Sequence, residues 1–390
     1  MNEQNKKVPT IRFKGFTDDW EQRKLSKLTT EIGTGKSKYK LQDNGRYPIL
    51  GSTSVIGYDN NFDYTGDFIL TARVGANAGN LYRFAGSVKI TDNTVFIKSK
   101  YNKFLYYYLQ KYDLKKLSFG TGQPLVKASE LKNLKILKPR LDEEIYRISK
   151  LLLSVDNLIT LHQRKLVLLK QLKKGLLQKM FAEKNSKQPN LRFKNFNGDW
   201  EQRKLGELIE SLFQGINTAA DKVEYSNNGL PIIQAKNITS GSLDFSGSRK
   251  LSVQKYSNYL DKYIPQKGDI LFANIGTIGP NVILKDTRQF FIAWNILRIV
   301  PQKNINGEFL KITLDLLNSK HYFEKLLTGN ATKFVNKNDM RNLPIFFSDP
   351  EEQNKISNLF KKLDFLITLQ QQKLAKYQSI KKSLLQQMFI

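Results

Sequence analysis

The sequence predicts an α+β protein in which two α/β domains are separated by two long antiparallel coiled-coil helices, related by a pseudo-two-fold internal repeat. Three observations lead to this fold class. Two blocks of sequence occur twice, two stretches of about 40 residues carry a helical heptad pattern, and the segments between them combine short strand patterns with one helix.

The internal repeat consists of two pairs of blocks. Residues 11–28 and 191–208 are identical at 12 of 18 positions, and residues 142–181 and 350–389 at 20 of 40. The segments between the blocks, 29–141 and 209–349, differ in length and sequence. Simple duplication with drift is the alternative, but drift would have blurred all segments equally. We therefore favour one scaffold that presents two different surfaces.

The second pair of blocks predicts two long helices, 142–184 and 350–390. Apolar residues recur there at alternating steps of three and four over about five heptads, and 40 residues of helix span roughly 60 Å. The predicted seam contains Ile148, Leu152, Val155, Ile159, His162 and Leu166 in the first helix and Ile356, Phe360, Leu363, Ile367, Gln370 and Leu374 in the second.

The two polar seam residues, His162 and Gln370, lie at the midpoints of their helices. In a fully overlapping pair they meet in one polar layer, which fixes the register for parallel and antiparallel pairs alike. The connection from the end of the first helix, through residues 185–349, to the start of the second favours the antiparallel pair.

The intervening segments share one plan. Strand patterns occur at 47–50, 67–72, 80–84, 94–97 and 134–138 in the first segment and at 231–234, 269–273, 281–284, 296–300 and 344–347 in the second. Each segment also contains a helical stretch, 103–116 or 307–327, followed by a loop at 119–123 or 328–332. A common framework with dissimilar loops is typical of domains whose loops carry the function.

Composition limits the chemistry. The chain has 390 residues, no cysteine and two histidines, which excludes disulfides, thiol catalysis and cysteine-based metal sites, and we expect no metal site. The net charge of +28 lies mainly outside the two helical blocks and indicates a polyanionic partner, most simply nucleic acid. The first ten residues lack an apolar run and no 18-residue apolar stretch occurs, so we expect a cytoplasmic protein with no membrane partner.

Residue types that read DNA bases gather in the loops. Arg and Lys recognise guanine, Asn and Gln recognise adenine, and Ser and Thr bond to either, while flanking cations hold phosphates. The candidate DNA-binding residues are Lys36, Lys38, Lys40, Ser52, Thr53, Ser54, Arg73, Asn77 and Gln123 in the first segment and Gln214, Asn217, Gln234, Lys236, Asn237, Asn274, Thr277, Asn330 and Lys333 in the second.

The catalytic motifs that the sequence suggests are incomplete. Gly33–Ser37 imitates a phosphate-binding loop, but Thr30 stands where that motif requires glycine. Leu151–Asp156 imitates the acidic strand of an ATPase, yet Leu152 and Val155 belong to the helical seam. No adenine-methyltransferase motif and no GxGxxG is present. We therefore expect no catalytic residues in this chain.

Four repeated features resemble those of type I restriction–modification specificity subunits. They are the duplicated Trp-Glu-Gln-Arg-Lys-Leu segments at Trp20–Leu25 and Trp200–Leu205, the Gly-Asp strands at Gly66–Leu70 and Gly268–Leu271, the loop-and-strand endings Gly122–Pro139 and Gly329–Pro344, and the helix ends Leu176–Phe181 and Leu384–Phe389. The resemblance covers essentially the whole chain.

The resemblance implies a division of labour. Two target-recognition domains, 1–141 and 185–349, would each read one half of a bipartite site in double-stranded DNA. The helices 142–184 and 350–390 would set the spacing and dock two methyltransferase subunits, and two restriction/translocase subunits would join them. S-adenosylmethionine, ATP and Mg²⁺ would be used by these partners, and this chain would hold no cofactor. The alternative from another class is a non-catalytic, basic coiled-coil assembly protein that binds RNA or acidic partners.

Overall fold

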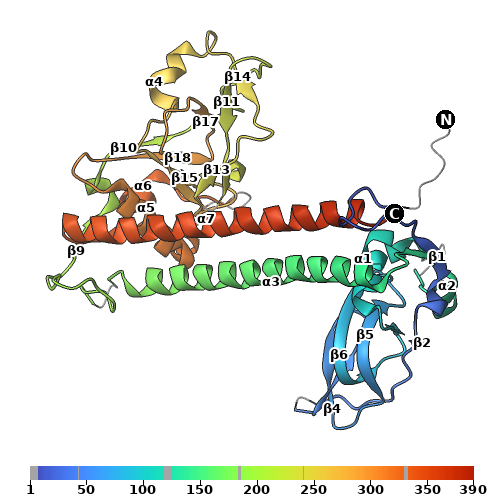
Figure 1. Ribbon diagram of the computed structural model, residues 1–390. Coiled ribbons are helices and arrows are strands. Elements are labelled where there is room, and N and C mark those ends of the chain that lie inside the picture. Colours follow the sequence, from blue (N-terminus) through green and yellow to red (C-terminus); the bar gives the residue numbers. More distant parts are fainter. Residues whose placement is uncertain (1–7, 43, 118–123, 183–185, 240, 329–332) are drawn as a thin grey trace. The chain divides into compact units, whose positions relative to one another are not determined.

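The computed structural model describes residues 8–42, 44–117, 124–182, 186–239, 241–328 and 333–390. The chain divides into two compact units (Figure 1). Unit 1 is Met1–Lys165 with Gln370–Ile390, and unit 2 is Leu166–Leu369. Each unit contains one β-rich domain and part of both long helices, so the division cuts across the predicted helical segments.

The long helices are α3 (Asp142–Lys179) and α7 (Pro350–Gln387), which begin at the predicted residues. Acidic residues occupy the first turn of both helices, where their negative charge interacts favourably with the positive end of the helix dipole. In unit 1 the α3–α7 contacts pair Asp156 with Lys381 and His162 with Gln370. In unit 2, Lys173 pairs with Asp364. Because the α7 number falls as the α3 number rises in unit 1, the helices are antiparallel, as predicted.

Polar contacts along the helix pair repeat with the internal symmetry. The Asp156–Lys381 pair (2.8 Å) and the Lys173–Asp364 pair (2.6 Å) join equivalent positions of the two repeats. His162 Nδ1 lies 2.7 Å from Gln370 Oε1, and the imidazole stacks on Tyr377. The predicted polar layer is therefore confirmed, and all twelve predicted seam residues are buried or half-buried.

Unit 1 contains a six-stranded sheet in the order β2-β7-β5-β6-β3-β4. The strands are β2 (Glu31–Thr34), β3 (Tyr47–Leu50), β4 (Val55–Asp59), β5 (Tyr64–Ala72), β6 (Leu81–Ile90) and β7 (Thr94–Lys98). Only β3 and β6 pair in parallel. Around the sheet lie η1 (Leu25–Lys27), α1 (Asn102–Tyr112), η2 (Leu114–Leu117), α2 (Ala128–Asn133) and the two-stranded sheet of β1 (Glu21–Lys24) and β8 (Lys135–Lys138). The core joins sheet residues such as Ile69 and Ile97 to Phe104 of α1 and Leu152 of α3.

Unit 2 divides the equivalent sheet in two. One sheet is β10-β18-β15-β16 and the other β14-β11-β17, with β9–β19 and β12–β13 as separate pairs. The strands are β9 (Glu201–Lys204), β10 (Ile209–Gln214), β11 (Leu230–Ile233), β12 (Ile238–Thr239), β13 (Ser242–Leu243), β14 (Lys250–Leu251), β15 (Ile270–Ala273), β16 (Asn281–Ile283), β17 (Phe291–Ile292), β18 (Ile296–Pro301) and β19 (Pro344–Phe347). The long β6 of unit 1 bridges β5 and β3, whereas here β16 pairs with β15 and β17 pairs with β11.

The helical segments of unit 2 outside α3 and α7 are short. They are η3 (Leu205–Glu207), η4 (Ala235–Asn237), η5 (Ser257–Tyr259), α4 (Leu260–Tyr263), α5 (Gly307–Ser319), η6 (Tyr322–Leu326) and α6 (Lys337–Arg341). The predicted helices 103–116 and 307–327 therefore end early, at Tyr112 and Ser319. In both, a residue just beyond the helix, Asp113 or His321, adopts a left-handed backbone (φ 60° and 54°), which stops helix propagation.

An Arg–Glu–Trp cluster attaches each β-rich domain to a long helix. Glu144 of α3, 1% exposed, accepts two hydrogen bonds from Arg12 (2.7 and 2.8 Å) and one from Trp20 Nε1. In unit 2, Glu352 of α7 accepts the same bonds from Arg192 and Trp200. The first repeated block thus supplies the Arg and Trp, and the second supplies the Glu.

None of the helices in the part of the chain that the structure describes combines the length and the apolar character needed to cross a membrane.

Candidate nucleic-acid interface

In unit 1 the loops at one edge of the sheet are joined by backbone hydrogen bonds. We call this surface edge 1: residues 35–37, 50–54, 72–77, 91–94 and 124–126. Gly35 N donates to Thr94 O, Thr91 N to Leu50 O, Arg73 N to Asn93 O and Gly75 N to Pro124 O, at 2.9 to 3.1 Å. Five segments that are distant in sequence therefore form one continuous surface.

Unit 2 builds the same surface from equivalent segments. Edge 2 comprises residues 214–217, 233–236, 274–277, 292–296 and 333–335. Gly215 N donates to Ile296 O (3.0 Å), Ala293 N to Ile233 O (2.8 Å) and Asn274 N to Asn295 O (3.2 Å). Val126 N bonds to Arg73 O in edge 1, and Val335 N bonds to Asn274 O in edge 2. Arg73 and Asn274 are therefore equivalent positions on one backbone framework that carry different side chains.

Most predicted residues of the first segment lie at edge 1. Lys36, Thr53, Ser54 and Asn77 are exposed. Arg73 is half-buried, with its guanidinium Nη1 donating to the Asp92 carbonyl (3.2 Å), and Ser52 Oγ donates to the Asn93 carbonyl (3.2 Å). These two bonds tie the predicted side chains to the β6–β7 turn and fix their positions.

The remaining first-segment candidates lie beyond edge 1. Lys38 and Lys40 are exposed on the loop that leaves edge 1 toward β4, where Lys40 N bonds to Asp59. Gln123 lies outside the described residues. Lys38 and Lys40 suit phosphate contacts beside the edge, because long cationic side chains reach backbone charges without needing a fixed geometry.

The second segment divides into exposed and internal candidates. Asn217, Lys236, Thr277 and Lys333 are exposed on or beside edge 2, and Gln214 and Gln234 are half-buried there. Asn330 lies outside the described residues. Edge 2 thus brings together four loops that the sequence pattern had selected separately.

Two of the predicted base-reading residues are buried. Asn274, 1% exposed, donates to the Val335 carbonyl (3.0 Å) and accepts from Gln214 Nε2 (3.1 Å). Asn237, 5% exposed, accepts from Gln234 N (2.9 Å) and donates to the Asp244 carbonyl (2.8 Å). Because both amides are satisfied internally, they hold the loops in place, and their burial argues against the direct base contact expected for them.

Sequence reasoning missed Trp294, which lies in the β17–β18 turn of edge 2 and is 40% exposed. The candidate DNA-binding residues were chosen for side chains that hydrogen-bond to bases, so an aromatic side chain was not included. The sequence offered no clear signal for it, because Trp294 lies in the run Phe290–Leu297, which is apolar except for Asn295 and is typical of a buried segment.

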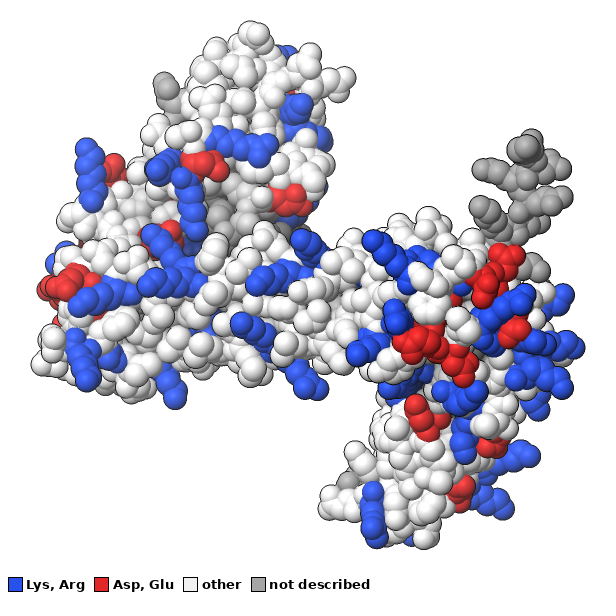
Figure 2. Space-filling view, viewed as in Figure 1, with Lys and Arg blue, Asp and Glu red and all other residues white. Residues whose placement is uncertain are grey.

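Basic charge accompanies both units. On the face shown in Figure 2, Lys and Arg are spread over both units and Asp and Glu are fewer. Lys36 at edge 1 and Lys333 at edge 2 are exposed. Cations beside a loop surface of this kind can hold phosphates while the loops approach the bases.

The long helices also expose apolar side chains. On α3, Leu158, Leu161, Leu168 and Leu172 are 36–64% exposed and recur at steps of three, seven and four, which places them on one side of the helix. On α7, Phe365 is 66% exposed. Large apolar residues gathered in this way mark a protein-interaction surface.

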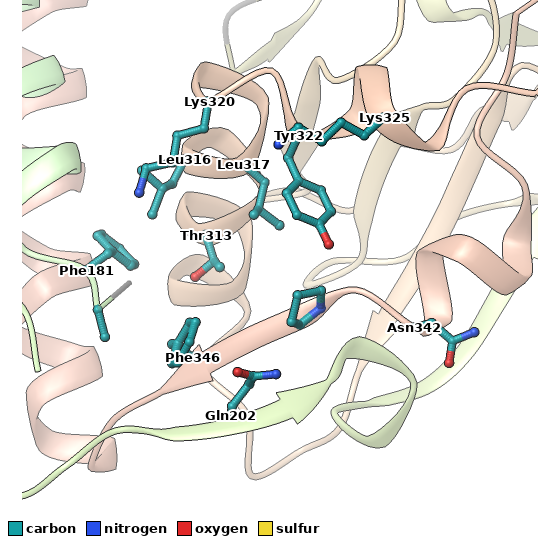
Figure 3. Close-up of a pocket in the computed structure, with 12 residues that line it drawn as sticks. Phe181, Gln202, Thr313, Leu316, Leu317, Lys320, Tyr322, Lys325, Asn342 and Phe346 are labelled. Carbon is teal, nitrogen blue, oxygen red and sulfur yellow. The ribbon is translucent and has the colours of Figure 1, made fainter. Parts of the chain in front are cut away.

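A cavity of about 670 Å³ lies in unit 2, away from edge 2 (Figure 3). Side chains from α5, η6, β9 and β19 surround it, including Leu316, Tyr322, Gln202 and Phe346. Thr313 of α5 lines this space, and its position corresponds to Tyr108 of unit 1, whose ring is buried in the core. None of the described residues that line the cavity carries a carboxylate that could support acid–base chemistry.

Comparison with known proteins identifies the family. The model of the type I restriction modification DNA specificity domain matches residues 17–171 and 197–378, which is most of the chain and includes both β-rich domains. The chain belongs to this family. Among curated type I specificity subunits, it is 27% identical to the MjaVIII subunit of Methanocaldococcus jannaschii, across 80% of this chain and 75% of that one. It is 23% identical to the putative MjaX subunit of the same organism, across 94% and 92%.

Solved type I structures share the fold of this specificity chain. The S subunit from M. genitalium aligns with a TM-score of 0.68 at 16% identity, covering 98% of this chain and 99% of that one. A chain from a structure of type I complex assembly aligns with a TM-score of 0.54 at 14% identity, covering 95% and 97%. At these identities the likeness concerns the fold alone.

Proposed function

We propose that this chain is the subunit that selects the DNA sequence in a type I restriction–modification complex, with each edge reading one half of a bipartite site. The observation that carries this proposal is the pair of equivalent loop frameworks with different side chains. The exposed Asp92 of edge 1 corresponds to the exposed Trp294 of edge 2, and the half-buried Arg73 corresponds to the buried Asn274. Two similar frameworks with dissimilar surfaces suit the reading of two dissimilar half-sites.

The paired helices would set the distance between the half-sites. Ion pairs and the His162–Gln370 layer fix the register of α3 against α7. A paired helix resists bending and sliding, since either motion would break several of these contacts together. The bases between the half-sites would then be spanned without being read.

The exposed leucines of α3 would dock two methyltransferase subunits, and two restriction/translocase subunits would join that core. Adenine methylation with S-adenosylmethionine and cleavage driven by ATP and Mg²⁺ would be carried out by these partners. This chain would supply selection alone, because its sequence carries none of the methyltransferase or ATPase motifs. The family match favours this function over the alternative of a basic coiled-coil assembly protein that binds RNA or acidic partners.

The test is to co-express the chain with a methyltransferase subunit of a type I system and to sequence the methylated adenines in the host genome. We expect one bipartite motif with a fixed gap. A host without the chain is the control, and it should lack this motif. Methylation scattered without a motif, or a complex that binds RNA in preference to duplex DNA, would contradict the proposal.

A further inference from the structure

Trp294 differs from the other two tryptophans of the chain. Trp20 and Trp200 are 1% and 2% exposed, and each donates its indole N–H to a buried glutamate. Trp294 is 40% exposed. Within the described residues, it belongs to no packed apolar cluster and stacks on no ring. Exposing an indole forgoes the large stabilisation that its burial gives, so an indole kept on the surface suggests a binding role.

The backbone of Trp294 is held on both sides of the residue. Its N–H donates to the Ile216 carbonyl (2.7 Å), and its carbonyl accepts a hydrogen bond from Gln214 Nε2. The next residue, Asn295, accepts from Ala235 N through its side chain (3.1 Å). Two separate loops, 214–217 and 233–236, thus fix the turn, so the indole is presented from a rigid support and little conformational freedom remains to be lost on binding.

The surroundings of Trp294 suit a nucleic acid better than a protein. The loops bonded to its turn carry the exposed Asn217 and Lys236, and the half-buried Gln214 contacts the turn directly. A protein-docking surface would place further apolar side chains around the indole. An exposed aromatic beside amides and cations instead suits apolar contact with a base edge while the cations hold phosphates.

We propose that the Trp294 indole contacts a base in the DNA half-site that edge 2 reads. This inference rests on the proposed function and adds a specificity-determining residue to it. The corresponding residue of edge 1 is Asp92, whose carboxylate would repel a phosphate backbone and whose carbonyl already accepts from Arg73. The aromatic contact therefore belongs to one half-site only.

The direct test uses ¹⁹F NMR. The full chain is labelled with 5-fluorotryptophan and assembled with unlabelled methyltransferase subunits, so three resonances arise from Trp20, Trp200 and Trp294. Trp294→Phe assigns the third. The probe is a duplex that contains the motif found by methylation sequencing. We expect this duplex to shift the Trp294 resonance and to leave the two buried tryptophans unchanged.

Each other outcome has a defined meaning. If the duplex binds and the Trp294 resonance does not move, this inference is overturned while the proposed function stands. If the resonance moves when the methyltransferase subunits are added and not when DNA is added, Trp294 is a protein contact and the inference is also overturned. If no duplex binds the assembled wild-type complex, the proposed function itself fails.

Affinity measurements give a second readout. The loss of one base contact in a duplex site lowers affinity by roughly 5- to 150-fold, so Trp294→Ala should weaken duplex binding by about that factor. Trp294→Phe should retain part of the duplex-binding affinity that Trp294→Ala loses. Tyr225→Ala is the matched control, since Tyr225 is 38% exposed in the same domain but precedes the opposite end of β11. Equal losses for Trp294→Ala and Tyr225→Ala would overturn the inference.

Discussion

Replacing Glu144 with glutamine tests how the first β-rich domain is attached to α3. The Glu144 carboxylate accepts both bonds of the Arg12 guanidinium, which is 13% exposed, and the bond from Trp20. This carboxylate also raises the pKa of Arg12 above its ordinary value, so the guanidinium stays charged. Glutamine keeps the shape and one acceptor, but it leaves a nearly buried cation without a counter-charge.

The magnitude follows from the burial of the pair. Removing one partner of a buried ion pair lowers the free energy of unfolding by about 3–5 kcal/mol. Because glutamine keeps one oxygen that can accept a hydrogen bond, we expect Glu144→Gln to lie near the lower value. For a unit of this size, each kcal/mol corresponds to roughly 2–4 °C in Tm, so we expect unit 1 to lose about 6–12 °C. Differential scanning calorimetry of the full chain measures this change. Glu352→Gln should lower the transition of unit 2 by a similar amount, because its contacts are equivalent.

The matched control is the neighbouring residue on the same helix. Glu143 forms an ion pair with Arg147 in which both side chains are about half exposed, and such pairs contribute little to stability. Glu143→Gln should therefore change the Tm by no more than about 2–4 °C, the equivalent of 1 kcal/mol. If Glu144→Gln and Glu143→Gln have the same effect, the buried cluster does not hold the domain to the helix.

The remaining predictions concern the proposed DNA contacts. Deleting seven residues from the middle of both α3 and α7 keeps the heptad seam but shortens each helix by about 10 Å, so sequencing of methylated sites should show a gap shorter by about three base pairs with unchanged half-sites. Arg73→Ala should relax one half-site of the methylated motif and leave the other intact, and relaxation of both would contradict separate reading. Asn274→Ala should lower stability by about 1–3 kcal/mol in denaturant unfolding, because it leaves the buried Val335 carbonyl without its side-chain donor and removes one of the two acceptors of Gln214 Nε2. Lys333→Ala should weaken duplex binding equally for all sequences and reduce the slope of log affinity against log salt by about one, as measured by fluorescence anisotropy.

The sequence predicted the elements with long, strong patterns. The heptads of α3 and α7 extend over about ten turns, and the His162–Gln370 layer followed from them. The antiparallel direction was inferred from the connection between the two helices. The strands β1 and β9 were missed because their sequence, EQRK, is polar throughout and shows no alternation. Both are held by pairing with a strand that is distant in sequence, β8 or β19, which local sequence does not reveal.

The sequence predicted which residue types gather at the candidate interface, but it predicted only in part which of these residues are exposed. The loops rich in Asn, Gln, Lys and Arg do meet at two edges. Burial within those loops depends on which backbone groups pair across the domain, so Asn237 and Asn274 could not be distinguished from exposed neighbours such as Asn217. The structure distinguishes them because it shows the internal partners of each amide.

The duplicated Arg–Glu–Trp cluster has an evolutionary consequence. Each β-rich domain is anchored through residues that are the same in both repeats, while the loops that face outward share little. Recombination between related genes within the anchoring blocks would exchange a whole domain and preserve the Arg–Glu–Trp contacts that attach it to the helix. A lineage could thereby acquire a new target sequence in one genetic event, without having to re-optimise stability or assembly.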